Sequence, residues 1–156
     1  MMKSKYFLMA GGVISALIST VHAVLVVEPA LFVYISAGRE SVLAQMAIQG
    51  SSPTTAATIG LALIFAIWAL YAFSGAGLIR PLPLLRAALI FISVIYLLRA
   101  LAVFPEINMV MNQGYPFRFV VFSIISLVTG LLYLLGFLLW VNNIQLPPKH
   151  NALNSL

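Results

Sequence analysis

Four long apolar stretches, separated by polar or proline-containing segments, dominate the pattern of the chain. We expect each stretch to form a membrane-spanning helix, because about 20 predominantly apolar residues suffice to cross a bilayer. The expected spans cover about residues 5–27, 56–79, 85–104 and 118–141. The pattern therefore predicts an all-α polytopic membrane protein, a four-helix transmembrane bundle that forms one domain over residues 1–142. Residues 143–156 are expected to form a flexible cytoplasmic tail.

The third stretch decides the topology. The residues between Arg86 and Arg99 are too few to cross a bilayer, so a helix that crosses here must carry Arg99 within it. A central charge costs about 2.5–3.5 kcal/mol on insertion scales, and less near a helix end. If this stretch did not cross, the two chain ends would lie on opposite sides. We expect Pro105 to end or kink the helix, and residues 106–117 to form a loop.

The longest connection, residues 28–52, carries a second helical pattern. Apolar residues fall at helical spacing within the segment 39–49, while Arg39, Glu40 and Gln45 occupy other positions. The apolar positions are Val42, Leu43, Met46 and Ala47. This pattern predicts a short amphipathic helix in the first external loop, which either caps the bundle or lies on the membrane surface. A mobile gate is the alternative.

Composition and charge support a membrane environment. Hydrophobic residues make up 63% of the 156 residues and charged residues only 7%, whereas soluble domains carry roughly 25% charged residues. With four spans, one side holds most of the basic residues, which indicates that both termini are cytoplasmic. The basic residues on that side are Lys3, Lys5, Arg80, Arg86 and Lys149. We therefore interpret the net charge of +5 as a topology signal and expect no nucleic-acid partner.

Small residues recur every four positions in two of the stretches. Gly11, Ser15 and Ser19 share one face of the first stretch, and Ser126 and Gly130 share a face of the fourth. Small side chains allow membrane helices to approach closely. We expect both faces to pack against neighbouring helices.

Polar residues gather at one predicted end of the bundle and form the candidate site. Arg99 would be its cation, His22 and Tyr96 its hydrogen-bonding walls, and Glu28 or Glu106 its counter-ion. Such an outward-facing cavity could hold an anionic small molecule or a lipid headgroup. The alternatives are that Arg99 extends its head to the surface or forms a structural ion pair, and that His22 is a packing residue.

Enzyme and cofactor signals are missing from the sequence. It has no cysteine, two histidines, no P-loop, no nucleophile elbow and no HExxH motif. We therefore expect no metal, no cofactor and no enzymatic activity. The expected function is that of an accessory or structural membrane protein, which binds lipid, a membrane-protein partner or a second copy of itself. The alternative is a small homo-oligomeric transporter or channel for a small anionic solute.

Three motifs carry a resemblance to known proteins: GAGLIRPLPLLR at residues 75–86, YLLRAL at 96–101 and GYPFRFVVFS at 114–123. With these motifs the chain resembles uncharacterised small bacterial four-span inner-membrane proteins. The resemblance implies the four-span topology and a bacterial inner (plasma) membrane, and it implies no activity. To the four-helix small multidrug exporters the chain is similar only in helix number and size.

Overall fold

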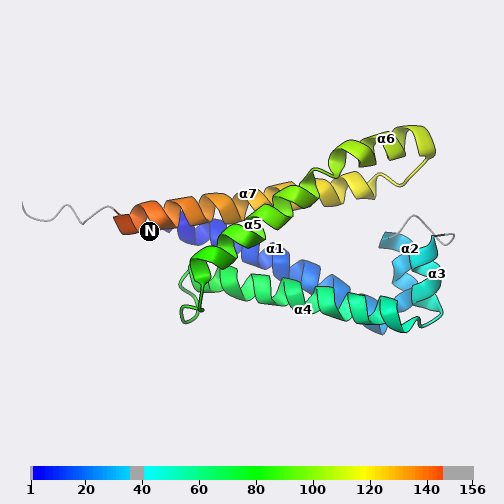
Figure 1. Ribbon diagram of the computed structural model, residues 1–156, viewed down its shortest axis with the longest axis horizontal. Helices are drawn as coiled ribbons and strands as arrows, with labels where there is room; N and C mark the ends of the chain where they lie inside the picture. Colours follow the sequence, from blue (N-terminus) through cyan, green and yellow to red (C-terminus); the bar gives the residue numbers. More distant parts are fainter. Residues whose placement is uncertain (1, 36–40, 146–156) are drawn as a thin grey trace, which may run out of the picture.

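The described part of the chain is mostly helical. The computed structural model describes residues 2–35 and 41–145 (Figure 1). The helices are α1 (Met2–Val27), η1 (Pro29–Leu31), α2 (Phe32–Ile35), α3 (Val42–Ile48), α4 (Ser52–Gly75), α5 (Leu85–Ala100), α6 (Val103–Gln113) and α7 (Arg118–Gln145). The predicted all-α class is confirmed for these residues. Arg39 and Glu40 of the predicted loop helix, and residues 146–156 of the predicted tail, lie outside the described residues.

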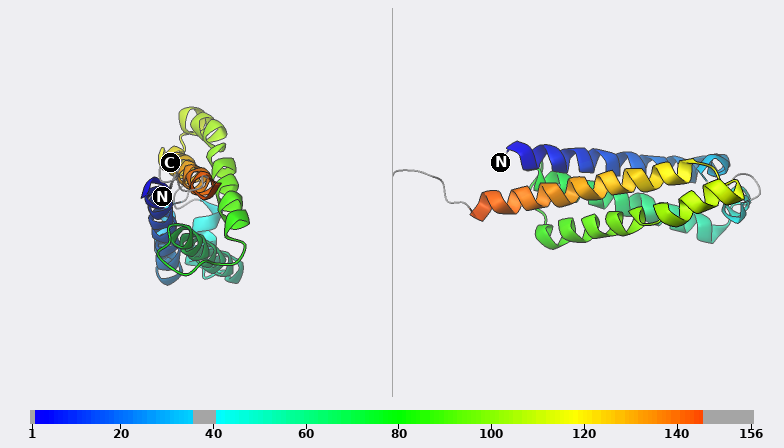
Figure 2. Two further views of the ribbon diagram at one scale, coloured as in Figure 1. Left: turned by 90° about the vertical axis from the view of Figure 1, so that its left-hand side faces the viewer. Right: turned by 90° about the horizontal axis from the view of Figure 1, so that it is seen from above.

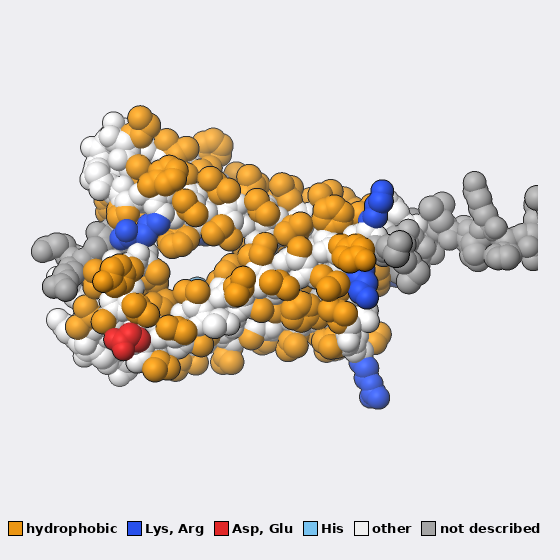
Figure 3. All heavy atoms as spheres, turned by 180° about the vertical axis from the view of Figure 1, so that it is seen from behind, with side chains coloured by type: hydrophobic (Ala, Val, Ile, Leu, Met, Phe, Trp, Pro, Cys, Tyr) orange, Lys and Arg blue, Asp and Glu red, His pale blue; other side chains and the backbone are white. Residues whose placement is uncertain are grey.

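Four helical segments are long and apolar enough to cross a membrane. They are Lys3–Val27, Ser52–Gly75, Leu85–Gln113 and Arg118–Asn142. Each contains a window with a mean hydropathy of at least 2.0. Large apolar side chains also cover the helix surfaces, and Lys and Arg side chains gather at the two ends of the bundle (Figure 3). This distribution supports a multi-pass membrane protein.

The four long helices form two pairs, α1 with α4 and α5 with α7, and α1 also packs on α7. The N-terminus and the end of α7 lie at the same end of the bundle, called here the terminus end (Figure 2). The short helices α2 and α3 and helix α6 lie at the opposite end, the loop end (Figure 1). The two pairs separate towards the loop end, where the space-filling view shows a hollow between them (Figure 3).

Two glycines of α7 lie where α1 and α5 approach it closely. A Cβ atom built on Gly136 of α7 would lie 3.2 Å from the backbone nitrogen of Leu8 and 2.7 Å from its Cγ atom. A Cβ on Gly130 would lie 3.1 Å from the backbone nitrogen of Leu97. Leu8, which lies against Gly136, is fully buried. Glycine at these positions allows α1 and α5 to approach the α7 backbone closely.

The third segment differs from its prediction. Helix α5 ends at Ala100, and α6 begins at Val103 and continues to Gln113, so most of the predicted loop at 106–117 is helical. Pro105 lies in the first turn of α6, where its missing N–H group has no intrahelical partner to lose. Gly114, with φ of 69°, then ends the helix. Of the two predicted outcomes, a helix end at Pro105 was wrong, because proline is equally compatible with the first turn of a new helix. The break at residues 101–102, just before Pro105, is closer to the predicted kink.

Helix α3 occupies part of the predicted loop helix. The hydroxyl oxygen of Ser41 accepts a hydrogen bond of 3.1 Å from the backbone nitrogen of Ala44 and caps its start. Ala44 and Ala47 are buried, whereas Val42 and Leu43 are exposed. Placement of this helix on a membrane surface stays a prediction.

Candidate functional site

A buried serine joins the four long helices. Ser15 of α1 lies 2.9 Å from the hydroxyl groups of both Tyr96 on α5 and Tyr133 on α7. The Tyr133 hydroxyl donates to the carbonyl oxygen of Trp68 on α4 over 3.0 Å. Because Tyr133 has one hydroxyl proton, Ser15 donates to Tyr133 and in turn accepts from Tyr96. We call these four residues the Ser15 node.

Aromatic rings close the bundle around the Ser15 node. The Tyr96 ring lies 5.1 Å from the Trp68 ring in an edge contact and 5.9 Å from the stacked Tyr133 ring. Tyr96 is only 3% exposed, and Tyr133 is fully buried. The structure therefore places Tyr96 in the closed core, and not in the wall of a cavity around Arg99 as the sequence suggested. Tyr96 precedes Arg99 by three positions on α5, and its hydroxyl contacts Ser15 of α1.

His22 also lies apart from Arg99. Its Nδ1 atom donates to the carbonyl oxygen of Ile18 over 2.8 Å, which satisfies one ring nitrogen within α1. Its ring packs on Phe65 of α4 at 5.2 Å. This arrangement corresponds to the packing role that was the alternative to a ligand-binding role.

Arg99 instead belongs to a cluster with Glu106 and Ser123, called here the charged cluster. The Nη1 atom of Arg99 lies 3.1 Å from Oε1 of Glu106 and donates to the Ser123 hydroxyl over 2.7 Å. Ser123 donates to Oε2 of Glu106 over 2.5 Å. The ion pair spans the break between α5 and α6, and Ser123 attaches it to α7. The Arg99 side chain is 42% exposed and that of Glu106 only 12%.

Of the two predicted counter-ions, the structure pairs Glu106 with Arg99. Glu28 is exposed, and its backbone N–H group donates to Val24 at the end of α1. Ser123 was not among the predicted site residues, and its role as a bridge between Arg99 and Glu106 was missed. Serine is common on packed membrane helices, so its identity gives no sign of a charged partner.

The residues predicted to pack helices lie at helix contacts, with one qualification. Gly11 lies against Tyr133, Gly130 lies against Leu97, and the Ser19 hydroxyl donates to the Ala62 carbonyl on α4 over 2.7 Å. Ser126 is buried, yet its hydroxyl donates within α7 to Phe122. The sequence did not reveal Ser93, which joins α5 to α7 through the Gly130 carbonyl oxygen at 3.0 Å.

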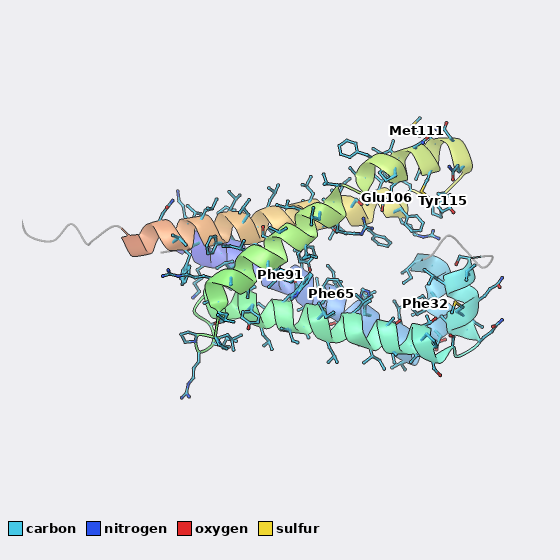
Figure 4. All side chains as sticks on the ribbon, viewed as in Figure 1. Phe32, Phe65, Phe91, Glu106, Met111 and Tyr115 are labelled. Carbon is cyan, nitrogen blue, oxygen red and sulfur yellow. The ribbon has the colours of Figure 1, made fainter. Side chains whose placement is uncertain are left out.

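A pocket of about 160 Å³ adjoins the charged cluster at the loop end. Its lining residues are Glu106, Met109, Tyr115 and Phe119. The Tyr115 and Phe119 rings lie 6.0 Å apart at an angle of 56°. Glu106 and Tyr115 lie near each other in Figure 4, at the end of the molecule opposite the termini. The pocket thus combines one paired carboxylate with aromatic and thioether walls.

Metal chemistry and family membership gain no support here. Within the described residues, no group of three His, Asp or Glu side chains could hold a metal ion. Comparison with protein-family models, curated proteins and solved structures found no match. The resemblance to small bacterial four-span proteins therefore stays a prediction.

Proposed function

We propose that the protein is a small accessory membrane protein, without catalytic activity of its own, which binds lipid at its loop end. It would lie in a bacterial inner membrane with both termini cytoplasmic, as the distribution of basic residues indicates. The observation that carries the proposal is the charged cluster. Its guanidinium is neutralised by Glu106, and the Arg99 side chain as a whole is still 42% exposed among apolar surfaces.

The partly exposed Arg99 side chain, at the end of α5, can contact lipid in addition to Glu106 and Ser123. Arg99 lies 14 residues beyond Leu85, and at about 1.5 Å per helical residue this places it roughly two thirds of the way across a core of about 30 Å. At that depth an arginine side chain reaches towards headgroup phosphates. The hollow between the helix pairs would give lipid access to this region (Figure 3).

The tightly packed interior of the bundle favours a lipid-binding function over conduction of a solute through the chain. Leu8, Leu89, Ile92 and Tyr133 are at most 1% exposed, and the hydroxyl groups of the Ser15 node are all bonded to one another or to backbone. A path for solute through one chain would have to disrupt this packing. The alternative function, a homo-oligomeric transporter or channel for a small anion, would therefore need a path between subunits.

Lipid retention and solute flux separate these functions. Native mass spectrometry of the purified protein should show retained phospholipid, and Arg99→Gln should lower its occupancy. Arg80→Gln, which changes an exposed arginine at the other end, should leave occupancy unchanged. Saturable anion flux in liposomes that is lost in Arg99→Ala would favour transport. Unchanged occupancy in Arg99→Gln, with only lowered stability, would contradict the lipid site.

A further inference from the structure

We infer that the pocket beside the charged cluster binds the primary ammonium group of a phosphatidylethanolamine headgroup, whose phosphate lies on Arg99. This inference rests on the proposed function and names the lipid class that the site prefers. It follows from the chemistry of three adjoining features: a carboxylate, two aromatic walls and a partly exposed guanidinium.

The carboxylate supplies the first contact. Glu106 lines the pocket while its two oxygens bond Arg99 and Ser123. An ionised carboxylate can accept more hydrogen bonds than these two. A primary ammonium group can donate several hydrogen bonds, whereas the trimethylammonium group of choline can donate none. This difference favours ethanolamine over choline.

The walls of the pocket suit a cation. Tyr115 and Phe119 present aromatic rings 6.0 Å apart, and Met109 adds a polarisable thioether. Aromatic faces attract ammonium groups through their quadrupoles, most strongly where water is scarce. A small cation is therefore a better occupant of this space than a second anion.

The phosphate has its own partner next to the pocket. The hydrogen bond of Arg99 to Ser123 and its ion pair with Glu106 both use Nη1, and the side chain is 42% exposed. The remaining guanidinium edge can donate to a phosphate oxygen, a strong charge-assisted contact. In an ethanolamine headgroup, only two carbon atoms separate the phosphate oxygen from the ammonium group. The lipid's phosphate and ammonium can therefore contact the neighbouring Arg99 and Glu106, respectively.

A lipid fits this site better than a free solute. The surrounding helices expose Phe104, Met111 and Phe117 to the extent of 63–78%. An acyl chain that runs from this headgroup towards the bilayer centre would cover Phe104, which precedes Glu106 on α6, while the headgroup occupies the pocket. We therefore assign the site to the membrane lipid and treat a soluble amine phosphate as an outcome of the test.

The test compares lipid headgroups on the full-length protein. Native mass spectrometry would measure binding of phosphatidylethanolamine, phosphatidylcholine and phosphatidylglycerol with identical chains. We expect the wild type to prefer phosphatidylethanolamine. Glu106→Gln should bind it about tenfold more weakly, the effect of one lost charge-assisted hydrogen bond. The same variant should gain affinity for phosphatidylglycerol, because Arg99 loses its neutralising partner. Glu28→Gln, an exposed carboxylate at the end of α1, is the matched control and should change neither.

A second variant separates binding from folding. Tyr115→Leu removes an aromatic wall and retains the ion pair, so it should weaken phosphatidylethanolamine binding without raising phosphatidylglycerol binding. Tyr34→Leu, at an aromatic residue 71% exposed, should have no effect. Equal binding of the three headgroups, or a Glu106→Gln variant with wild-type preference, would overturn the inference. Soluble phosphoethanolamine binding as tightly as the lipid would overturn the assignment to lipid. Retention of no phospholipid at all would instead contradict the proposed function.

Discussion

At the scale of single residues, Ser15 connects helices that are far apart in the sequence. Its fully buried hydroxyl joins Tyr96 and Tyr133, and through Tyr133 the backbone of α4. Hydrogen bonds between membrane helices contribute about 0.6 kcal/mol on average and up to about 1.7 kcal/mol. A hydroxyl that makes two such bonds should lie towards the upper part of this range.

We predict that Ser15→Ala lowers the free energy of unfolding by about 1–2 kcal/mol, since the Tyr96 hydroxyl then loses its acceptor. Reversible unfolding in bicelles would measure the change. Thr20→Ala is the control, because this exposed hydroxyl bonds only within α1 to the Ala16 carbonyl oxygen. Equal stability losses in the two variants would show that the Ser15 node does not hold the helices together.

The residues of the candidate site were predicted only in part. Arg99 was expected to pair with either Glu28 or Glu106, and it pairs with Glu106. Tyr96 was expected beside them and lies against Ser15, whereas His22, for which a packing role was the alternative, lies against Phe65. Helical spacing gives the relative positions of residues along one helix. It does not give the rotation of that helix against its neighbours, which decides the partners of a polar side chain.

At the scale of elements, glycine positions determine how closely the helices approach. Gly136 and Gly60 both lie within long helices, yet only Gly136 faces a neighbouring backbone. A Cβ on Gly60 would meet nothing within 4 Å. Substitution of Gly60 is therefore a matched control for substitution of Gly136.

We predict that Gly136→Ala destabilises the bundle, because the new methyl group would push α7 away from Leu8 of α1. Overpacking of this kind costs about 1–3 kcal/mol. Gly60→Ala should be neutral or stabilising by up to about 1 kcal/mol, since alanine favours the helix. Thermal unfolding in one detergent would compare the two variants. A Gly136→Ala variant as stable as Gly60→Ala would contradict the close packing of α1 on α7.

Elements were predictable where their apolar runs are long and uninterrupted. The helices α1, α4 and α7 arise from such runs, and the structure has a helix in each. An interruption near Pro105 was expected, but its position at residues 101–102 and the helix α6 beyond it were not, because proline is also consistent with a new first turn. The Arg99–Glu106 ion pair, which spans this break, depends on tertiary packing against Ser123.

At the scale of the whole molecule, the two ends of the bundle differ in how tightly their helices pack. The terminus half is packed through glycine contacts and the Ser15 node, whereas the loop end separates into two arms (Figure 1). The charged cluster and its pocket lie on the arm formed by α6 and α7. This division places the proposed lipid contact at the end away from the closed core.

Photo-crosslinking tests the proposed lipid site most directly. A phospholipid with a photoreactive group in its headgroup would be crosslinked to the protein in native membranes, and mass spectrometry would locate the labelled peptides. We predict labelling concentrated within residues 99–119, and reduced in Glu106→Gln but not in Glu28→Gln. Labelling spread evenly over both ends of the bundle, or confined to residues 76–86 at the terminus end, would contradict the account.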